Sequence, residues 1–570
     1  MMIFRASDYQ SVVEPLIHHS KTGPEKIAVV FINDDETEEF FSYRQLHENA
    51  LRYARVLKTA GIQSGDIVIL ALRHKADLIW SLMGALYLGA IPSIFIYKGP
   101  MTPLGSYIRR VKKMVEFSQA SMVVALPDYA AELEDLLSGA ECQVLNIEAV
   151  PSYEESMGIP PQPEFTSGED IAYLQYTSGT TGMQKGVMLS HRAILNYGES
   201  TAIALKITDQ DVFVNWLPLY HDFGLFGGLF ISLFCGISTV LMSPYKWLRK
   251  PHLHLWAIHN HKGTISFLPN SAHHHTVRYV NDRSIQGLDL SSLRVLFNGA
   301  EPILYRSQEL FLERFAAYGF SENAFVSGYG MAENTLGVSY SAVGKRARVD
   351  WVDAREMKIS GKAVPAPRYK ESTKPVVSCG PALTGTELAI LDDLENRLSD
   401  RHIGEITIRS TALFSGYYKR PDLTAQVMKN GWYRTGDMGY MAGNELYVCG
   451  RKKDLIIVGG DNIHPEDLES IAQSVPGIRP DRSVAFGVHS PEIGTEKIVM
   501  VCEIINADDE SQRLAIEREL RRRVYNDLEV TIGDVHLVKK GWIEKTQNSK
   551  IARKANREKY EEYLAVKEEA

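Results

Sequence analysis

Short apolar runs alternate with amphipathic stretches along most of this 570-residue chain. Residues 67–71 are continuously apolar and bounded by polar positions, which predicts a buried strand. Residues 76–88 predict a helix, and residues 89–92 (Gly-Ala-Ile-Pro) predict a turn into the next strand. Three further runs repeat the strand pattern: residues 122–126, 144–147 and 171–176. Strands that alternate with helices indicate an α/β architecture with buried sheets.

One nearly apolar segment, residues 225–242, is long enough to suggest a membrane span. Several glycines and hydroxyl residues interrupt it, however. The pattern favours a buried helix that ends near Gly236, followed by a strand over residues 238–242. The N-terminus, Met-Met-Ile-Phe-Arg-Ala-Ser-Asp, has no long apolar core, so a signal peptide is not expected. We therefore predict a protein with no membrane span.

Length and composition narrow the class of protein. A chain of 570 residues exceeds one hydrophobic core and predicts at least two domains. The net charge of -8 argues against a general nucleic-acid-binding protein. The five cysteines are odd in number and lack metal-ligand spacing, which predicts free thiols in a reducing compartment. We expect a cytoplasmic protein that binds no nucleic acid.

The regular alternation breaks over residues 346–373. This stretch is polar, rich in Lys and Arg, and carries Pro365 and Pro367. It predicts an insertion or a long excursion between two core elements. Regular structure resumes near residue 376, and from residue 446 onward the pattern is that of a smaller α+β unit with many charges.

The most informative stretch is residues 176–188, Tyr-Thr-Ser-Gly-Thr-Thr-Gly-Met-Gln-Lys-Gly-Val-Met. It offers backbone N–H groups, hydroxyls and a cation at one place, which is what a polyphosphate needs. It is not a Walker A loop, because Gln184 stands where that motif needs glycine and Gly186 where it needs Ser or Thr. A polar hairpin turn is the alternative interpretation.

The loop resembles the phosphate loop of the adenylate-forming enzymes, which include acyl-CoA synthetases, luciferases, peptide-synthetase adenylation domains and fatty acyl-AMP ligases. The family loop ends Pro-Lys-Gly; here Gln184 replaces the proline and Lys185 is in place. The resemblance implies that ATP is bound by these residues of the loop: Thr177, Ser178, Gly179, Thr180, Thr181, Gly182 and Lys185.

Residues 216–225, Trp-Leu-Pro-Leu-Tyr-His-Asp-Phe-Gly-Leu, resemble the second core motif of the family. The resemblance implies that His221 lies against the substrate carboxylate and takes part in catalysis. The alternative is a pair of His221 and Asp222 that caps the start of a helix. The two interpretations are compatible.

Two later motifs resemble the family's adenine and magnesium motifs. Residues 298–302, Asn-Gly-Ala-Glu-Pro, follow an apolar strand, and their small side chains allow a planar ring to lie against the backbone. The resemblance implies adenine contacts from Asn298, Gly299, Ala300, Tyr329 and Gly330. It implies that Glu333, a hard oxygen ligand, holds magnesium bound to phosphate. The alternative for residues 298–302 is a plain turn, and the alternative for Glu333 is a surface carboxylate at the start of a helix.

The C-terminal motifs complete the resemblance. Residues 433–437, Tyr-Arg-Thr-Gly-Asp, resemble the ribose motif, in which Asp437 accepts hydrogen bonds from both sugar hydroxyls. The resemblance implies that Arg451 contacts the nucleotide and that Lys453 lies at the position of the hinge residue between the two domains. Residues 545–553 resemble the catalytic-lysine motif, which makes Lys550 the cation that neutralises departing pyrophosphate. The alternative for residues 451–454 is an exposed turn, and the alternative for Lys550 is a lysine in a basic tail.

Together the motifs most resemble fatty acyl-AMP ligases, over nearly the whole chain. The resemblance implies a large N-terminal domain of buried sheets flanked by helices, residues 1–450, and a small mobile α+β domain, residues 451–570. It implies that ATP and Mg²⁺ activate a fatty acid carboxylate to acyl-AMP, with release of pyrophosphate. The acyl group then passes to the phosphopantetheine thiol of an acyl carrier protein. In this branch an insertion near the domain junction accompanies the carrier preference, and residues 346–373 are its expected position.

Three alternatives stay open. The first is an acyl-CoA synthetase that uses free coenzyme A, which the general-family character of the loop beginning at Gly459 favours. The second is an amino-acid-activating enzyme, with Asp222 paired to an α-amine. The third is a non-catalytic sensor of acyl-AMP or AMP, against which the presence of Glu333, Asp437 and Lys550 argues.

Two charged or metal-binding features have plainer interpretations. The histidines at 252–261 and 273–275 lack the Cys or carboxylate partners of a metal site. The run Arg521-Arg522-Arg523, with Lys539 and Lys540, offers a docking surface for an acidic carrier protein. The alternative for the arginine run is a solvated helix face.

Overall fold

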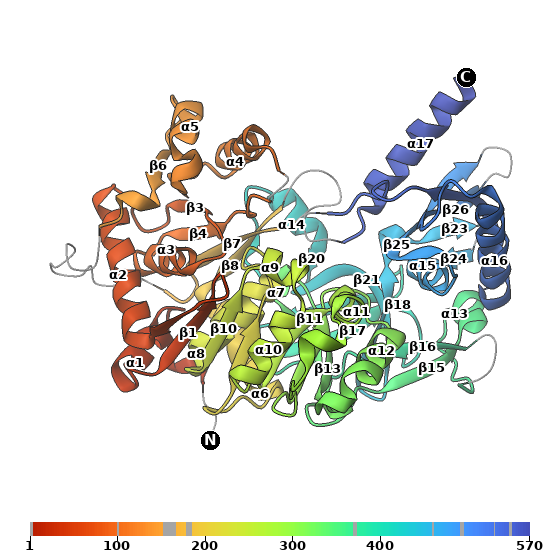
Figure 1. Ribbon diagram of the computed structural model, residues 1–570, viewed down its shortest axis with the longest axis horizontal. Helices are drawn as coiled ribbons and strands as arrows, with labels where there is room; N and C mark the ends of the chain where they lie inside the picture. The colour runs from red at the N-terminus through yellow and green to blue at the C-terminus, as the bar shows by residue number, and fades with distance from the viewer. Residues whose placement is uncertain are drawn as a thin grey trace.

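A computed structural model describes residues 4–99, 102–151, 167–177, 185–368, 373–458, 461–490, 495–528, 530–546 and 550–569. The chain forms a large α/β N-terminal domain and a smaller C-terminal domain, drawn in blue at the right of Figure 1. This arrangement confirms the predicted fold class.

An eight-stranded sheet is the centre of the N-terminal domain. Its inner strands pair in parallel, and antiparallel strands close both edges. The inner strands are buried on both faces, so they read as apolar runs and not as alternating ones. In sheet order the strands are β14 (Gly337–Tyr340), β13 (Phe325–Gly330), β12 (Val295–Gly299), β11 (Ile265–Pro269), β9 (Val212–Asn215), β10 (Ser238–Met242), β1 (Ile27–Ile32) and β2 (Glu38–Ser42).

Two smaller sheets hold most of the strands predicted near the N-terminus. A parallel sheet runs β4 (Ile91–Ile94), β3 (Ile67–Ala71), β5 (Met122–Ala125) and β6 (Gln143–Asn146). An antiparallel sheet runs β19 (Gly416–Tyr417), β8 (Lys185–Ser190) and β7 (Ile171–Thr177). The strands predicted at 67–71, 122–126, 144–147 and 171–176 are confirmed to within a residue at each end, and the helix predicted at 76–88 is α3 (Ala76–Tyr87).

Helices cover these sheets (Figure 1). The principal ones in the N-terminal domain are α1 (Glu14–Thr22), α2 (Tyr43–Thr59), α4 (Leu104–Ser118), α5 (Pro127–Leu137), α6 (His191–Ala204), α10 (His252–Asn260), α11 (Asn270–Tyr279), α12 (Tyr305–Phe315) and α14 (Pro421–Val427). Three shorter ones are α7 (Asp222–Gly224), α8 (Ile231–Cys235) and α9 (Pro244–Arg249).

The apolar segment 225–242 is buried in the protein core, as predicted. A π-helical turn, η4 (Leu225–Phe230), leads into α8, and Gly236 ends the helix with a left-handed φ of 63° before β10 begins. A side chain at Gly236 would meet the ring of His19 at 2.6 Å, so packing and backbone conformation both favour glycine there. Among the described residues, no helix combines the length and apolar character needed to cross a membrane.

The last part of the N-terminal domain is a five-stranded antiparallel sheet made of β17 (Thr386–Leu391), β18 (Gly404–Ser410), β21 (Trp432–Ala442), β20 (Met428–Lys429) and β22 (Glu445–Arg451). In the C-terminal domain, β25 (Ile478–Ser490), β26 (Thr495–Ile504) and β27 (Ile532–Val538) form one sheet, and β23 (Ile456–Val458) and β24 (Asp461–Ile463) a second. Its helices are α15 (Pro465–Gln473), α16 (Glu510–Leu528) and α17 (Arg553–Glu569). Its two apolar clusters draw only on residues after 455.

Residues 346–373 hold regular elements in place of an irregular excursion. They contain β15 (Val349–Asp353) and α13 (Ala354–Ser360), and β15 pairs antiparallel with β16 (Thr373–Val377). Val352, Met357 and Ala363 are buried in an apolar cluster with strands β21 and β22, which explains why a polar stretch folds. This unit lies at the domain junction, because Lys374 in β16 forms an ion pair with Asp467 in α15.

All five cysteines are free thiols, as predicted.

Candidate functional site

The predicted site residues converge on one cleft where the carboxyl ends of β12 and β13 face the C-terminal domain. In sheets with parallel strands, ligands bind at this end of the strands. The cleft has a volume of about 2160 Å³, ample for a nucleotide and a second substrate. The predicted residues that line it are Lys185, His221, Ala300, Tyr329, Gly330, Glu333, Asp437, Arg451, Lys453 and Lys550.

His221 both caps a helix and lines the cleft. The Phe223 backbone N–H donates to His221 Nδ1 at 3.1 Å and to the Asp222 carboxylate at 2.7 Å, so the pair opens α7 as an N-cap. The same Nδ1 contacts the Asp222 carboxylate, which fixes the ring from one side. Burial works to raise the pKa of Asp222, but the charges of His221 and Lys550 hold it below its ordinary value. Asp222 therefore stays ionised beside the cleft.

Lys550 reaches from the C-terminal domain into this cleft. Its backbone N–H donates to Thr546 Oγ1 at 3.2 Å, and the Thr546 N–H donates to its carbonyl at 2.6 Å, so Thr546 holds both backbone groups of Lys550. Burial lowers the pKa of Lys550, and the nearby carboxylates of Glu301 and Asp222 oppose that shift. A desolvated cation among carboxylates has its charge available to a developing anion without competition from water.

Two residues of the nucleotide motifs face each other across β21 and β22. Asp437 and Arg451 are direct cross-strand neighbours, with Arg451 Nε 3.2 Å from Asp437 Oδ1. The Tyr329 hydroxyl donates to the other oxygen, Asp437 Oδ2, at 2.6 Å. Burial first, and then the charge of Asp437, raise the pKa of Tyr329, so its hydroxyl remains a donor. The Asp437 carboxylate is thereby held from two sides at the rim of the cleft.

Glu333 and Lys185 meet through a residue that the sequence analysis missed. The Tyr417 hydroxyl donates to Glu333 Oε1 at 2.6 Å, and Lys185 Nζ lies 4.7 Å from the centre of the Tyr417 ring. Tyr417 lies on β19, which pairs with β8 directly after the predicted phosphate loop. The sequence signal, a Gly-Tyr-Tyr run at 416–418, does not by itself indicate that partner.

The motif at 298–302 is split between two faces of β12. Phe297 lines the cleft, and strand alternation turns the fully buried Asn298 to the opposite face. Neither Asn298 nor Gly299 lines the cleft, and their expected place at adenine stays a prediction. Ala300 does line it, with a φ of 64°. A left-handed alanine is a strained conformation of the kind found at binding sites.

Thr177 and Lys453 are the other predicted positions that the structure describes. Ser178, Gly179, Thr180, Thr181 and Gly182 lie outside the described residues. Thr177 ends β7 and pairs with Lys185 at the start of β8. Lys453 follows the last strand of the large domain, and burial lowers its pKa.

The histidine and arginine groups have structural partners. His254 bonds Ser266, and His261 lies 2.9 Å from the Glu38 carboxylate. Across the described ranges, no group of three or more His, Cys, Asp or Glu side chains is arranged to hold a metal ion. The arginines at 521–523 pair with carboxylates on their own helix, Glu517 and Glu519, at 2.7–2.9 Å. This pairing favours a solvated helix face over a docking patch.

The chain is similar to known proteins over most of its length. The model of the AMP-binding enzyme family matches residues 16–418. A putative acyl-CoA synthetase of Caulobacter vibrioides is 30% identical over 96% of this chain and 95% of that protein. The medium-chain-fatty-acid–[acyl-carrier-protein] ligase JamA of Moorena producens is also 30% identical, over 97% of this chain and 95% of that protein. A solved structure from a study of fatty acyl-adenylate ligases of E. coli and L. pneumophila matches with a TM-score of 0.88 and 27% identity, covering 99% of this chain and 100% of that chain.

Proposed function

This chain belongs to the family of AMP-binding enzymes, and we propose on that basis that its cleft activates a fatty acid with ATP. The product is an acyl-adenylate, and the acyl group then passes to the phosphopantetheine thiol of an acyl carrier protein. The observation that carries the proposal is the convergence of Lys550 with Asp222 and Asp437 from the other domain. A protein that only binds a nucleotide does not need a buried lysine from a second domain in its cleft.

The first half-reaction joins two anions, so charge is its main obstacle. A carboxylate oxygen attacks the α-phosphorus of ATP, the new oxygen–phosphorus bond forms, and the bond to the β-phosphate oxygen breaks to release pyrophosphate. We assign Lys550 to the negative charge that grows on the leaving pyrophosphate and Lys185 to the phosphates of bound ATP. The two cations come from different domains, and both line the cleft.

Two side chains hold the reacting groups in place. We assign Asp437 to the ribose hydroxyls, because its carboxylate accepts two hydrogen bonds at once and is already oriented by Tyr329 and Arg451. We assign His221 to the fatty acid carboxylate, because Asp222 and the start of α7 fix its ring at the cleft wall. Positioning of this kind accounts for a large share of the rate of a two-substrate reaction.

The residues present also fit a magnesium ion. Glu333 offers a carboxylate beside the phosphate-side Lys185, with one oxygen held by Tyr417. Magnesium sites of this kind use one or two carboxylates and complete their shell with water and substrate phosphates. When bound there, the ion would neutralise phosphate charge.

The second half-reaction exchanges AMP for a thiol. The thiol sulfur attacks the acyl carbonyl, the carbon–oxygen bond to AMP breaks, and the thiol proton passes to solvent. We propose that the C-terminal domain, residues 451–570, turns about Lys453 between the two steps and withdraws Lys550. Conformational steps of this kind complete one catalytic constellation at a time.

A carrier protein is the proposed acceptor, with free coenzyme A as the alternative. The JamA relative is named a ligase of acyl carrier protein, whereas the Caulobacter relative is named a putative acyl-CoA synthetase. The unit formed by residues 346–373 supports the carrier, since it lies at the domain junction where the expected insertion would be.

Lys550→Ala tests the division of labour between the two steps. The native protein is incubated with radiolabelled ATP and fatty acids of several lengths, and acyl-AMP and pyrophosphate are measured. Loss of one preorganised cation costs about a hundred- to thousandfold in rate. We expect that loss in acyl-AMP formation, while transfer from preformed acyl-AMP to holo carrier protein continues.

Two results would count against the proposal. Normal acyl-AMP formation in the variant would remove Lys550 from the catalytic residues. Rapid thioester formation with coenzyme A, and none with holo carrier protein, would make the protein an acyl-CoA synthetase.

A further inference from the structure

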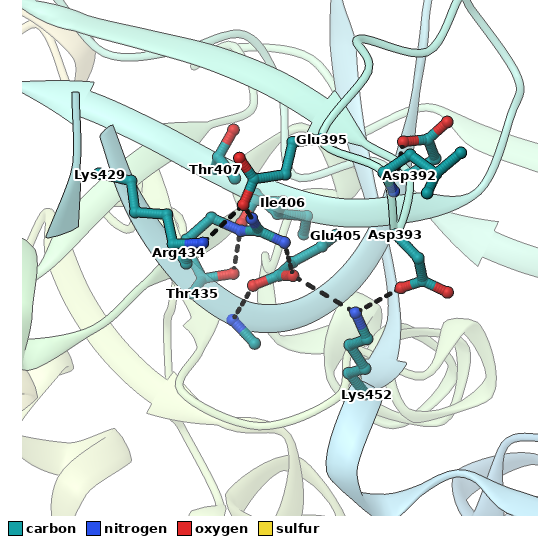
Figure 2. Close-up of polar contacts among 12 residues, drawn as sticks. Asp392, Asp393, Glu395, Glu405, Ile406, Thr407, Lys429, Arg434, Thr435 and Lys452 are labelled. Carbon is teal, nitrogen blue, oxygen red and sulfur yellow. Dashed lines mark hydrogen bonds and ion pairs between the residues drawn. The ribbon is translucent and has the colours of Figure 1, made fainter. Parts of the chain in front are cut away.

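A buried carboxylate that lines the cleft, Glu405, receives donors from residues 434–436 and faces Lys452. Glu405 lies on β18 and is 6% exposed. Its Oε2 accepts from Arg434 Nη2 at 2.5 Å, and its Oε1 accepts from the Gly436 backbone N–H at 3.2 Å. Lys452 Nζ lies 3.7 Å from the same Oε2, approaching from the end of β22 (Figure 2).

A turn after β17 completes this arrangement. Asp393, in that turn, accepts from Lys452 Nζ at 2.6 Å, so Lys452 lies between two carboxylates. Figure 2 shows the Lys452 side chain pointing toward both of them. We name Glu405, Arg434, Lys452 and Asp393 the Glu405 cluster.

The cluster joins the two segments that carry the ribose-site residues. Gly436 immediately precedes Asp437, and Lys452 immediately follows Arg451. Asp437 and Arg451 pair with each other at 3.2 Å. None of the four cluster residues is assigned a contact with substrate in the mechanism above, so their charges have no other role there.

We propose that the Glu405 cluster positions the Asp437 carboxylate for the ribose hydroxyls by clamping residues 434–436 to Lys452. Glu405 and Lys452 are thus positioning residues and not catalytic ones. The inference rests on the proposed function in one respect, the assignment of Asp437 to ribose.

Burial decides how much each member contributes. The side chain of Glu405 is 8% exposed, whereas that of Asp393 is 85% exposed and that of Lys452 41%. Solvent screens an exposed ion pair, and a buried carboxylate with charge-assisted bonds is screened little. The clamp therefore depends chiefly on Glu405, less on Lys452, and least on Asp393. The guanidinium of Arg434 keeps a second carboxylate, Glu395 at 3.1 Å, so loss of Glu405 does not leave it unpaired.

The test compares binding of ATP and 2′-deoxy-ATP by the full-length protein, measured by calorimetry without a fatty acid. If Asp437 reads the ribose, the native protein prefers ATP by about tenfold or more, the effect of one hydrogen bond to a charged group. Glu405→Gln should reduce that preference by at least about threefold, since the amide keeps the shape but not the charge. Lys452→Met should give a smaller reduction, and Lys452→Arg should restore the native preference.

Lys429→Met is the matched control. Lys429 lies in the same region and pairs with Glu395 at 2.7 Å, but it contacts neither Gly436 nor Lys452. Its removal should leave the ATP to 2′-deoxy-ATP ratio unchanged. A general loss of stability would weaken the binding of ATP and 2′-deoxy-ATP equally. The ratio of the two affinities therefore separates an effect on positioning from an effect on folding.

The outcomes are distinct. Native ratios in both Glu405→Gln and Lys452→Met would overturn the clamp, as would a native protein that binds the two nucleotides equally. If Glu405→Gln does not fold by circular dichroism, the exposed Lys452 variants decide. Absence of pyrophosphate release from the native protein with ATP and fatty acids would refute the proposed reaction, while the nucleotide ratios would still report on the clamp.

Discussion

Glu466→Gln should stabilise the C-terminal domain, and only at neutral to alkaline pH. Glu466 lies in the first turn of α15, where three carboxylates surround one guanidinium. Arg553 lies 2.9 Å from Asp454, 2.8 Å from Glu469 and 3.5 Å from Glu466. With all three carboxylates ionised the group carries net negative charge in a buried site, and Glu466 has the weakest contact.

Burial, reinforced by the charge of Glu469, raises the pKa of Glu466 to about 7 despite Arg553. A raised pKa means that the folded state resists ionisation. The protein is therefore most stable below pH 4.5, the pKa of this carboxyl in the unfolded chain. Its stability falls as the pH rises from 4.5 to about 7 and stays low above that. Moving the pKa from 4.5 to about 7 corresponds to a penalty of about 3 kcal/mol. The helix dipole favours ionisation here by only about 0.3–1 kcal/mol, so burial prevails.

The assay is urea unfolding of the full-length protein, followed by pulsed hydrogen exchange of peptides from β25 and β26. At about pH 8, Glu466→Gln should unfold at higher urea than the native protein, by up to about 3 kcal/mol, and near pH 4.5 the two should coincide. Asp467→Asn is the matched control, because it removes a neighbouring charge from the same helix turn. It breaks the ion pair with Lys374 and should destabilise the protein. An equal shift at both pH values, or no gain at high pH in Glu466→Gln, would refute the reasoning.

Three further predictions concern activity. Burial lowers the pKa of Lys550, so the active ammonium loses its proton at a lower pH than an ordinary lysine, and Lys550→Arg should extend the alkaline limb of acyl-AMP formation upward in a pH–rate profile. Glu333→Gln should raise the magnesium concentration needed for half-maximal acyl-AMP formation about tenfold, and an unchanged magnesium titration would make Glu333 structural. Because Arg522 pairs with Glu519 at 2.8 Å on an exposed helix face, Arg522→Gln should leave transfer to carrier protein within about twofold of native, and a large salt-dependent loss would restore the docking patch.

Local pattern accounts for the elements that were predicted correctly. Strands such as residues 67–71 are buried on both faces, so consecutive residues must be apolar. That pattern is visible in the sequence without knowledge of the fold. The end of α8 at Gly236 follows from a conformation that only glycine adopts easily.

Residues 346–373 were harder to interpret because their buried positions are few. Val352, Met357 and Ala363 are separated by charged residues, so no apolar run is visible. Their burial depends on partners in β21 and β22 that lie much later in the chain. Composition alone therefore suggested an excursion where the structure has two strands and a helix.

The sequence by itself determined which residues are candidates for the chemistry: a predicted phosphate loop that includes Lys185, the carboxylates of Glu333 and Asp437, and Lys550. These are local motifs, and local motifs are read from neighbouring residues. Only the tertiary structure decided which of these residues contact one another and through which partners. Contacts between distant segments arise from packing and not from periodicity. Tyr417 meets Glu333 across 84 positions, and Lys452 reaches Asp393 across 59. Contacts of that kind leave no spacing signal in the chain, since each side chain has only to be polar and correctly placed by its own strand.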